Sequence, residues 1–233
     1  PELPNELLEI LPLFTSCLPE FGIGQQDSEA VQTWQSRISG GVNCFSSIRS
    51  GLSNEQESKS FISLSSKALA KNHSELSNLL YQTIAHVRFD ESDRLADLIE
   101  QICSRKENSI TGQGHSLAMS LASSGFSPAA KLMHEFNGLE GIKRLKFIRK
   151  QISEERFSEG LLDKFKQLHE ILIKNPIQLL TITELDKQEK AIHDLDTLWS
   201  SNFCNQASDN GFSLPETRSK LAEAWTTSTQ VNF

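Results

Sequence analysis

One long helical stripe constrains this chain more than any other feature. Apolar residues recur every three or four positions from Leu95 to Leu121, which predicts one helix that ends near Ser123. Gly112 and Gly114 interrupt the stripe, and each costs about 1 kcal/mol relative to alanine inside a helix. We expect another stretch of backbone to approach closely at these glycines, because close approach would offset that cost.

Shorter helices are predicted on both sides of this stripe. Pro12 should kink or shorten the first of them, since proline removes a backbone donor. Possible N-caps are Asp27 or Ser28, Asp90 with Asp93, Ser127 before Pro128, Ser158, and Thr183 with Asp186. The helices cover about 5–18, 28–38, 69–87, 128–136, 142–152, 158–172 and 185–199, and Gly138 and Gly141 separate the fourth from the fifth.

Few strands accompany these helices. Residues 42–49 and 60–65 read as a hairpin with a long polar connection at 51–58, and residues 177–183 read as a third strand. Residues 227–233 look like a strand that is cut off after it starts. The excess of helices over strands predicts an α+β fold, in which a helix-rich domain packs on a small antiparallel or mixed sheet.

Composition narrows the class of protein. A hydrophobic content of 37% and a net charge of −7 describe an ordinary acidic chain and argue against nucleic acid as a partner. No apolar run approaches the roughly 20 residues that span a bilayer, and no signal peptide is readable after Pro1, so we expect an excised piece of a longer protein. The scattered thiols Cys17, Cys44, Cys103 and Cys204 form no CxxC pair, which favours reduced thiols and a reducing compartment.

Several phrases from Leu7 to about Ile152 resemble, in order and at matching distances, one known family. The phrases are LPLFTSCLPEFGIG, WQSRISGGV, FISLSSKALAKN, FDESDRL, SITGQGHSLAMSLASS, and SPAA followed by NGLEGI. They are similar to the second half of the presequence-protease branch of the insulinase or pitrilysin superfamily of zinc metallopeptidases. The ending EAWTTSTQVNF resembles that family's passage from its third homologous domain into its fourth.

The resemblance implies a domain plan. Family members have four homologous α/β domains in two hinged halves, which close around a chamber where zinc hydrolyses unstructured peptides. Residues 1–202 would be the third, non-catalytic domain without its first strands, 203–225 a linker, and 226–233 the first strand of the following domain. If strands are missing, the sheet has an open edge, and we expect self-association of the excised piece.

The family's catalytic element is absent from this stretch. That element is His-x-x-Glu-His on a helix, with two zinc-binding imidazoles one turn apart and a glutamate as general base. The six histidines, none with a second histidine at the forward or inverted spacing, are His73, His86, His115, His134, His169 and His193. We therefore predict no catalytic, cofactor-binding or metal-ligating residue, and expect zinc only in the catalytic domain of a parent enzyme.

Other residues that could be read as catalytic or ligand-binding have simpler structural interpretations. His115 lacks a partner ligand, so packing or a backbone carbonyl should satisfy it. Gly112 and Gly114 lack the rest of a phosphate-binding motif, Tyr81 matches no family motif, and no GxSxG elbow supports a serine nucleophile. The basic cluster, interpreted as the solvated face of an amphipathic helix, is Lys143, Arg144, Lys146, Arg149 and Lys150.

The sequence leaves two functions open. The first is a non-catalytic structural segment of a peptide-degrading zinc metallopeptidase, inactive alone, which forms chamber wall and contacts the catalytic half of the same polypeptide. Its compartment would be bacterial cytoplasm or an organelle matrix, and its other partners unstructured peptides. The second is a stand-alone assembly module that keeps an inactive peptidase-like fold. A third interpretation, an independent enzyme that uses cysteine or histidine chemistry, is not supported by any group of suitably spaced residues.

Overall fold

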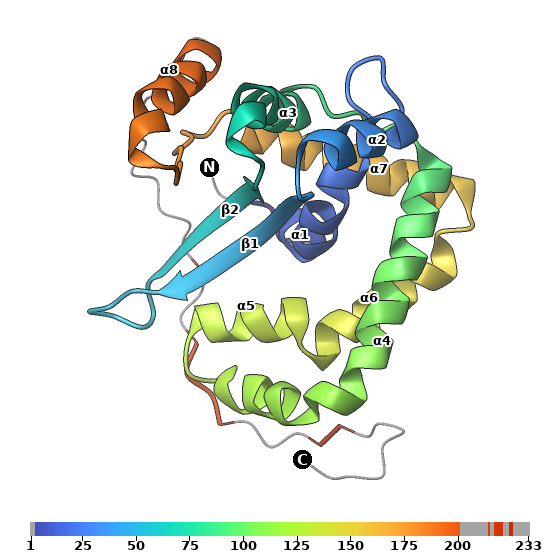
Figure 1. Ribbon diagram of the computed structural model, residues 1–233. Helices are drawn as coiled ribbons and strands as arrows, with labels where there is room; N and C mark the ends of the chain where they lie inside the picture. Colours follow the sequence, from blue (N-terminus) through green and yellow to red (C-terminus); the bar gives the residue numbers. More distant parts are fainter. Residues whose placement is uncertain (1–2, 201–213, 215–216, 221–223, 226–233) are drawn as a thin grey trace.

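The structure is a computed structural model that describes residues 3–200, 214, 217–220 and 224–225. Within these residues, α-helices accompany a single two-stranded hairpin (Figure 1), which confirms the predicted α+β class. The helices are α1 Asn5–Cys17, α2 Ser28–Ile38, α3 His73–Ala85, α4 Ser92–Ser123, α5 Pro128–Asn137, α6 Leu139–Gln151, α7 Glu155–Leu172 and α8 Gln188–Trp199. Three short 3-10 turns are η1 Leu18–Glu20, η2 Ala70–Asn72 and η3 Leu185–Lys187.

The hairpin pairs β1 Val42–Ser50 with β2 Ser58–Ser66 in antiparallel register from Val42 opposite Ser66 to Ser50 opposite Ser58. Helices α1 and α5 contact β1 and bury Ile48 on the covered face, whereas Val42 on the same face packs against apolar residues of α2 and α3. Alternate residues point the other way, and Phe45 and Phe61 are exposed there. The hairpin therefore has one packed face and one open face.

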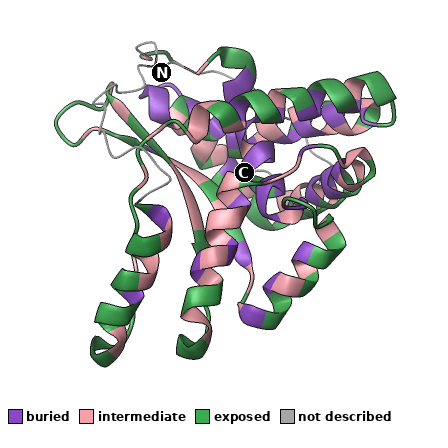
Figure 2. Ribbon diagram, turned by 90° about the horizontal axis from the view of Figure 1, so that it is seen from above, coloured by how far each residue is buried: buried purple, intermediate pink, exposed green. Residues whose placement is uncertain are grey.

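Four aromatic rings form the centre of the main core. Phe14 of α1 meets Phe165 of α7 edge to face with ring centroids 5.4 Å apart, and Phe21 meets Phe89 at 5.6 Å. Phe89 also packs against Phe14 and Phe165, at 5.9 and 6.0 Å. All four rings are buried. Figure 2 shows buried segments alternating with exposed ones along the helices, as expected when one side of each helix faces the core. A smaller apolar cluster joins α2, α3 and the start of β1.

The predicted third strand is wrong. Residues 176–184 form neither helix nor strand, and Leu180 and Ile182 are 88% and 91% exposed. A strand needs a neighbour to hydrogen-bond with, and among the described residues this segment pairs with none. Its alternating apolar residues therefore face solvent, and the described sheet has two strands.

Two of the predicted helix caps are confirmed. The side chains of Asp27 and Ser127 accept hydrogen bonds from the Ala30 and Ala130 N–H groups, at 2.9 and 3.2 Å. The caps predicted at Asp90, at Ser158 and at Thr183 with Asp186 are wrong. Asp90 pairs with Arg88 instead, α7 begins before Ser158, and η3 and α8 begin without a side-chain cap.

The long helix is confirmed, but the expected contact at one of its glycines is not. A Cβ at the exposed Gly112 would meet nothing within 4 Å, so no backbone approaches there. Figure 1 shows instead that α4 changes direction in its C-terminal half and ends alongside α5. Glycines are common where helices bend, which explains Gly112 better than a close contact does.

Close approach occurs at another glycine, in the corner between α5 and α6. A Cβ on Gly141 would lie 2.4 Å from the Phe136 carbonyl oxygen and 2.7 Å from its carbonyl carbon, which are backbone atoms with little room to move. One on Gly138 would lie 2.6 Å from the His134 carbonyl oxygen. These two glycines let α6 begin directly after α5.

We expect Gly141→Ala to lower the free energy of unfolding by about 1–3 kcal/mol, because the added methyl group overlaps backbone. Gly112→Ala and Gly160→Ala are matched controls, since a Cβ at either position meets nothing within 4 Å. The free energy of unfolding of each control should rise by up to about 1 kcal/mol, because alanine has a higher helix propensity than glycine. Urea unfolding of the three variants measures this, and a neutral Gly141→Ala would contradict the close approach.

Candidate functional site

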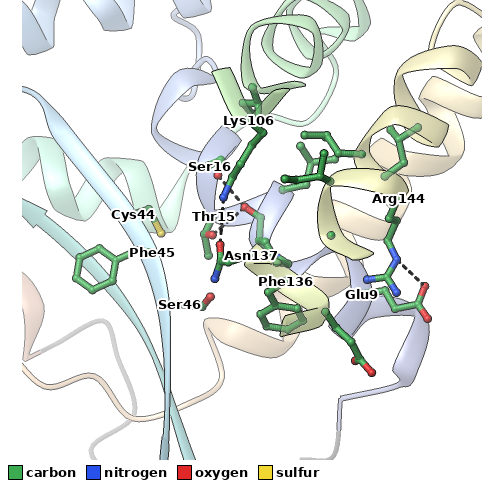
Figure 3. A pocket seen from close by; sticks show the side chains of 18 residues that line it. Glu9, Thr15, Ser16, Cys44, Phe45, Ser46, Lys106, Phe136, Asn137 and Arg144 are labelled. Atoms are coloured by element: carbon green, nitrogen blue, oxygen red, sulfur yellow. Dashed lines mark hydrogen bonds and ion pairs between the residues drawn. The ribbon is translucent and has the colours of Figure 1, made fainter. Parts of the chain in front are cut away.

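A cavity of about 170 Å³ lies where α1, β1, α4, α5 and α6 meet (Figure 3). One part of its wall is apolar, and the other carries polar side chains. The apolar residues are Pro12, Leu13, Ile102, Phe136, Ile142, Leu145 and Ile148. The polar or charged ones are Glu9, Thr15, Ser16, Cys44, Ser46, Lys106, Glu135, Asn137 and Arg144. Gly141 and Phe45 complete the lining, although the Phe45 ring itself points away from the cavity (Figure 3).

The local structure of α1 and of the α5–α6 corner shapes this wall. Pro12 lies inside α1, and its carbonyl oxygen accepts hydrogen bonds from the Thr15 and Ser16 hydroxyls at 3.1 and 2.8 Å. Those hydroxyls have therefore committed their protons to the helix. At the other side, the close turn at Gly141 brings the first turns of α6 against Asn137, the last residue of α5.

Lys106 is the principal polar group of the cavity. It projects from α4, and its Nζ donates a hydrogen bond to Asn137 Oδ1 at 3.3 Å (Figure 3). Burial lowers the pKa of Lys106 below its usual value of 10.5. Within the part of the chain that the structure describes, no carboxylate lies within 4 Å of this ammonium group. The second cation of the wall, Arg144, is offset by Glu9 at 3.7 Å.

The position of Lys106 in the sequence pattern, and no known motif, marks this lysine as unusual. Lys106 falls four positions after Ile102 and four before Ile110, so it lies on the apolar stripe of α4, among residues predicted to be buried. A lone lysine at such a position needs a local reason. Asn137 gave no comparable signal, because it meets Lys106 only through the folding of α5 against α4.

The three cysteines that the structure describes do not supply a nucleophile. Cys44 lines the cavity, and burial raises the pKa of its thiol to about 12, so it stays protonated at neutral pH. Burial also raises the pKa of Cys17 and Cys103, and all three thiols are free. Cys204 lies outside the described residues.

The histidines are spread over the fold. His115 is exposed, so the expected packing does not satisfy it, whereas His134 is buried and its Nδ1 has no hydrogen-bond partner. His169 Nε2 lies 2.6 Å from the Ile84 carbonyl oxygen, and His73 Nδ1 lies 3.5 Å from Asp194 Oδ2. Across the described part of the chain, no group of three or more His, Cys, Asp or Glu residues is placed to hold a metal ion.

Tyr81, set aside on sequence grounds, takes part in packing. Its ring lies edge to face with Trp199 at 5.5 Å and with His86 at 6.0 Å. The Trp199 indole N–H in turn donates to Ser77 Oγ at 3.1 Å. These contacts attach α8 to α3.

The basic cluster on α6 faces solvent in part, since Lys143 and Lys150 are exposed, and it also forms ion pairs. Glu107 of α4 receives Lys146 at 2.8 Å and Arg149 at 2.9 Å, which ties α6 to α4. Arg144 reaches Glu9 of α1, and Lys143 pairs with Glu140 on its own helix at 3.8 Å. Arg149 also lies 3.6 Å from Glu100, so four of the five cations have carboxylate partners within the chain, which leaves little charge for a binding patch.

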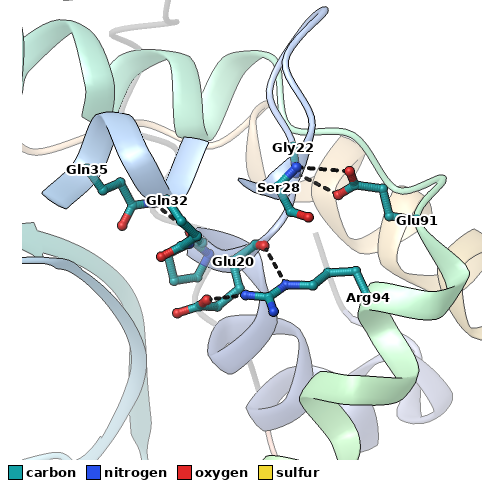
Figure 4. A network of polar contacts seen from close by, with 8 residues as sticks. Glu20, Gly22, Ser28, Gln32, Gln35, Glu91 and Arg94 are labelled. Carbon is teal, nitrogen blue, oxygen red and sulfur yellow. Dashed lines mark hydrogen bonds and ion pairs between the residues drawn. The ribbon is translucent and has the colours of Figure 1, made fainter. Parts of the chain in front are cut away.

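A second polar network fastens the first segments of the chain to α4 (Figure 4). The Glu91 carboxylate accepts hydrogen bonds from the N–H groups of Gly22 and Ser28 at 2.9 and 3.0 Å, and so caps α2 from a distance in sequence. Arg94 donates to the Glu20 carboxylate at 2.7 Å. Because these groups satisfy one another, the network is structural and offers no ligand site.

Comparisons with known proteins agree with one another. A family model matches residues 1–148, and its description is that of the region associated with peptidase family M16, subfamily C. Presequence protease 1, chloroplastic/mitochondrial, from Arabidopsis thaliana is 27% identical over 173 residues, which cover 73% of this chain and 16% of that protein. The mitochondrial presequence protease of Danio rerio is 28% identical over 146 residues, or 63% and 14% of the two chains.

The match to a further relative covers a larger share of this chain. The mitochondrial presequence protease of Debaryomyces hansenii is 26% identical over 233 residues, covering 91% of this chain and 22% of that protein. The chain thus spans less than a quarter of the length of each of these relatives. No helix among the described residues is long and apolar enough to cross a membrane.

We expect Lys106→Met to raise the melting temperature at pH 7, by about 2 °C for a chain of this size. Burial disfavours the charged lysine, so the unfolded chain binds more protons than the folded chain between the lowered pKa and 10.5. Stability of the natural chain therefore rises with pH in that window, and the advantage of the variant should shrink toward pH 10.5.

Thermal unfolding followed by circular dichroism at both pH values tests this expectation. Lys131→Met, at an exposed lysine of α5, is the matched control and should show no such pH-dependent gain. A Lys106→Met protein that melts below the natural chain at pH 7 would show that the ammonium group stabilises the fold.

Proposed function

Because this chain belongs to the family associated with subfamily C of the M16 peptidases, we propose that it is a non-catalytic structural segment of a zinc metallopeptidase that degrades unstructured peptides in a closed chamber. The family match over residues 1–148 carries the proposal, together with relatives that are named presequence proteases. The role assigned to this segment is to form chamber wall and to contact the catalytic half of the same polypeptide.

The donor groups of this segment do not fit a catalytic zinc site. His-x-x-Glu-His is missing, and the described histidines occupy separate helices and surroundings, with His134 buried, His169 on a backbone carbonyl and His115 exposed. We therefore assign zinc to the catalytic domain of the parent enzyme. This segment would take no chemical part in the cleavage. Its contribution would be to exclude folded proteins and to hold extended peptides in position.

The proposed domain limits are residues 1–202 for the third domain, 203–225 for a linker and 226–233 for the first strand of the next domain. Residues 226–233 lie outside the described part. Contacts of the described linker residues support an attached linker, because Thr217 N–H donates to Gln56 Oε1 and Ser219 N–H to the Gly125 carbonyl oxygen. For the compartment, we propose an organelle matrix or bacterial cytoplasm; the names of the relatives place those proteins in mitochondria or chloroplasts.

The chain alone should not cleave an unstructured peptide in the presence of zinc. It should restore cleavage when it is added, together with the separately expressed fourth domain, to the N-terminal half of its parent enzyme, because that half would supply the zinc site and this chain part of the wall. Mass spectrometry of the peptide products measures both reactions. Cleavage by the chain alone that a chelator stops would refute the non-catalytic role, and full activity of the N-terminal half without this chain would refute the wall role.

A second candidate function, a self-assembling interaction module, is favoured by the hairpin. Phe45 and Phe61 are 48% and 52% exposed on its open face, and each strand has a neighbour on one side only among the described residues. Open strand edges and exposed aromatic rings recruit other chains. The occupant we propose for this face is a second copy of the chain.

Light scattering should therefore give a mass above that of one 26.1 kDa chain at high concentration. Phe45→Ser with Phe61→Ser should restore the monomer, because the double variant removes both rings from the open face. Phe126→Ser is a control, since this phenylalanine is 71% exposed and lies in the loop between α4 and α5. A natural chain that stays monomeric at high concentration would contradict self-association.

A further inference from the structure

We propose that the cavity between α1, β1, α4, α5 and α6 binds a small apolar group that carries a single carboxylate, with Lys106 as the cation that receives it. The inference goes beyond the proposed function, because a chamber wall needs no such cavity. It also does not depend on that function, since it concerns the residues of this chain alone.

The cavity has the size and the lining for a small apolar group. Its volume is about 170 Å³, and a dry cavity of about 150 Å³ lined by aliphatic and aromatic side chains is enough to bind benzene. Ile102 of α4 and Phe136 of α5 line it together with Ile142, Leu145 and Ile148 of α6. Water gains few hydrogen bonds against such a wall, so an apolar ligand replaces it favourably.

Donors for a carboxylate lie at one place on the wall. The Lys106 ammonium group has three N–H donors and uses one on Asn137 Oδ1, at 3.3 Å. The Asn137 side chain adds its own amide N–H donors beside it. Thr15 and Ser16 cannot compete for this role, because their hydroxyls already donate to the Pro12 carbonyl oxygen. An anion at Lys106 would supply the charge partner that the described residues lack.

Neighbouring charges select a monoanion. Arg144 is already offset by Glu9, and the carboxylate of Glu135 also lines the cavity without an ion pair to Lys106. Because it forms no ion pair among the described residues, the carboxylate of Glu135 repels a second negative charge, which disfavours phosphate and dicarboxylates. Two kinds of ligand carry a single carboxylate on an apolar group: the carboxy-terminal residue of a peptide and a free apolar acid.

Titration calorimetry of the 233-residue chain at pH 7 tests the inference with three probes. N-acetyl-leucine imitates a peptide carboxy terminus, hexanoate is the free acid, and N-acetyl-leucine amide is the neutral control. We expect at least one acid to bind at least about tenfold more tightly than the amide, because a hydrogen bond to a charged group is lost with the amide. Which acid binds more tightly identifies the source.

Two variants connect binding to the proposed cation. Lys106→Met should weaken binding of the acid at least about tenfold, whereas the exposed-site control Lys131→Met should leave it unchanged. Asn137→Asp places a permanent carboxylate beside Lys106 and should weaken binding as well. Circular dichroism checks that each variant is folded. Equal affinity for acid and amide, acid binding that survives Lys106→Met, or no binding of either acid at its solubility limit would overturn the proposal.

Discussion

The contact among Phe14, Phe21, Phe89 and Phe165 is the interaction on which the rest of the structure depends. The four rings come from α1, the end of η1, the segment before α4, and α7, so their meeting joins parts of the chain that are far apart in sequence. Truncating one buried phenylalanine of this kind to alanine costs about 3–5 kcal/mol. With α1 and the start of α4 held here, Glu91 and Arg94 are in reach of the residues they bind around η1 and α2. The cavity depends on the same arrangement, because α1 and α4 form two of its walls.

Helices were predictable from the sequence where the signals were local. The stripe of α4 and the caps at Asp27 and Ser127 depend only on residues within a few positions of one another, and all three are present. The strand at 177–183 failed, because alternation of apolar residues cannot show whether a neighbouring strand exists. Asp90 failed as a cap for a related reason, since the next acidic residue, Glu91, serves α2 instead of its own helix. What the sequence did not reveal was therefore information about distant partners.

Glycine occurs in this fold for two different structural reasons that the sequence alone does not distinguish. Gly112 and Gly141 both interrupt helical patterns in the stretch that resembles the family. A Cβ at Gly112 would enter open space, whereas one at Gly141 would overlap the backbone of Phe136. Only the second position therefore needs glycine for close approach, and it also sets the corner that brings Asn137 to the cavity. No motif could have distinguished the two, because the difference lies in what a neighbouring helix end does.

Close packing explains the glycine at position 141, but packing does not explain Lys106. Packing alone would favour an apolar residue between Ile102 and Ile110, since burial disfavours the ammonium group and no described carboxylate offsets it. Proteins retain such destabilising groups chiefly where binding or chemistry needs them. The other cations on this side of the fold illustrate the contrast, because Lys146 and Arg149 share the carboxylate of Glu107 and so stabilise the contact between α4 and α6. A lysine that costs stability, aimed into a cavity beside an amide, has the properties of a ligand group, and this difference in charge pairing singles it out from the lysines of the basic cluster.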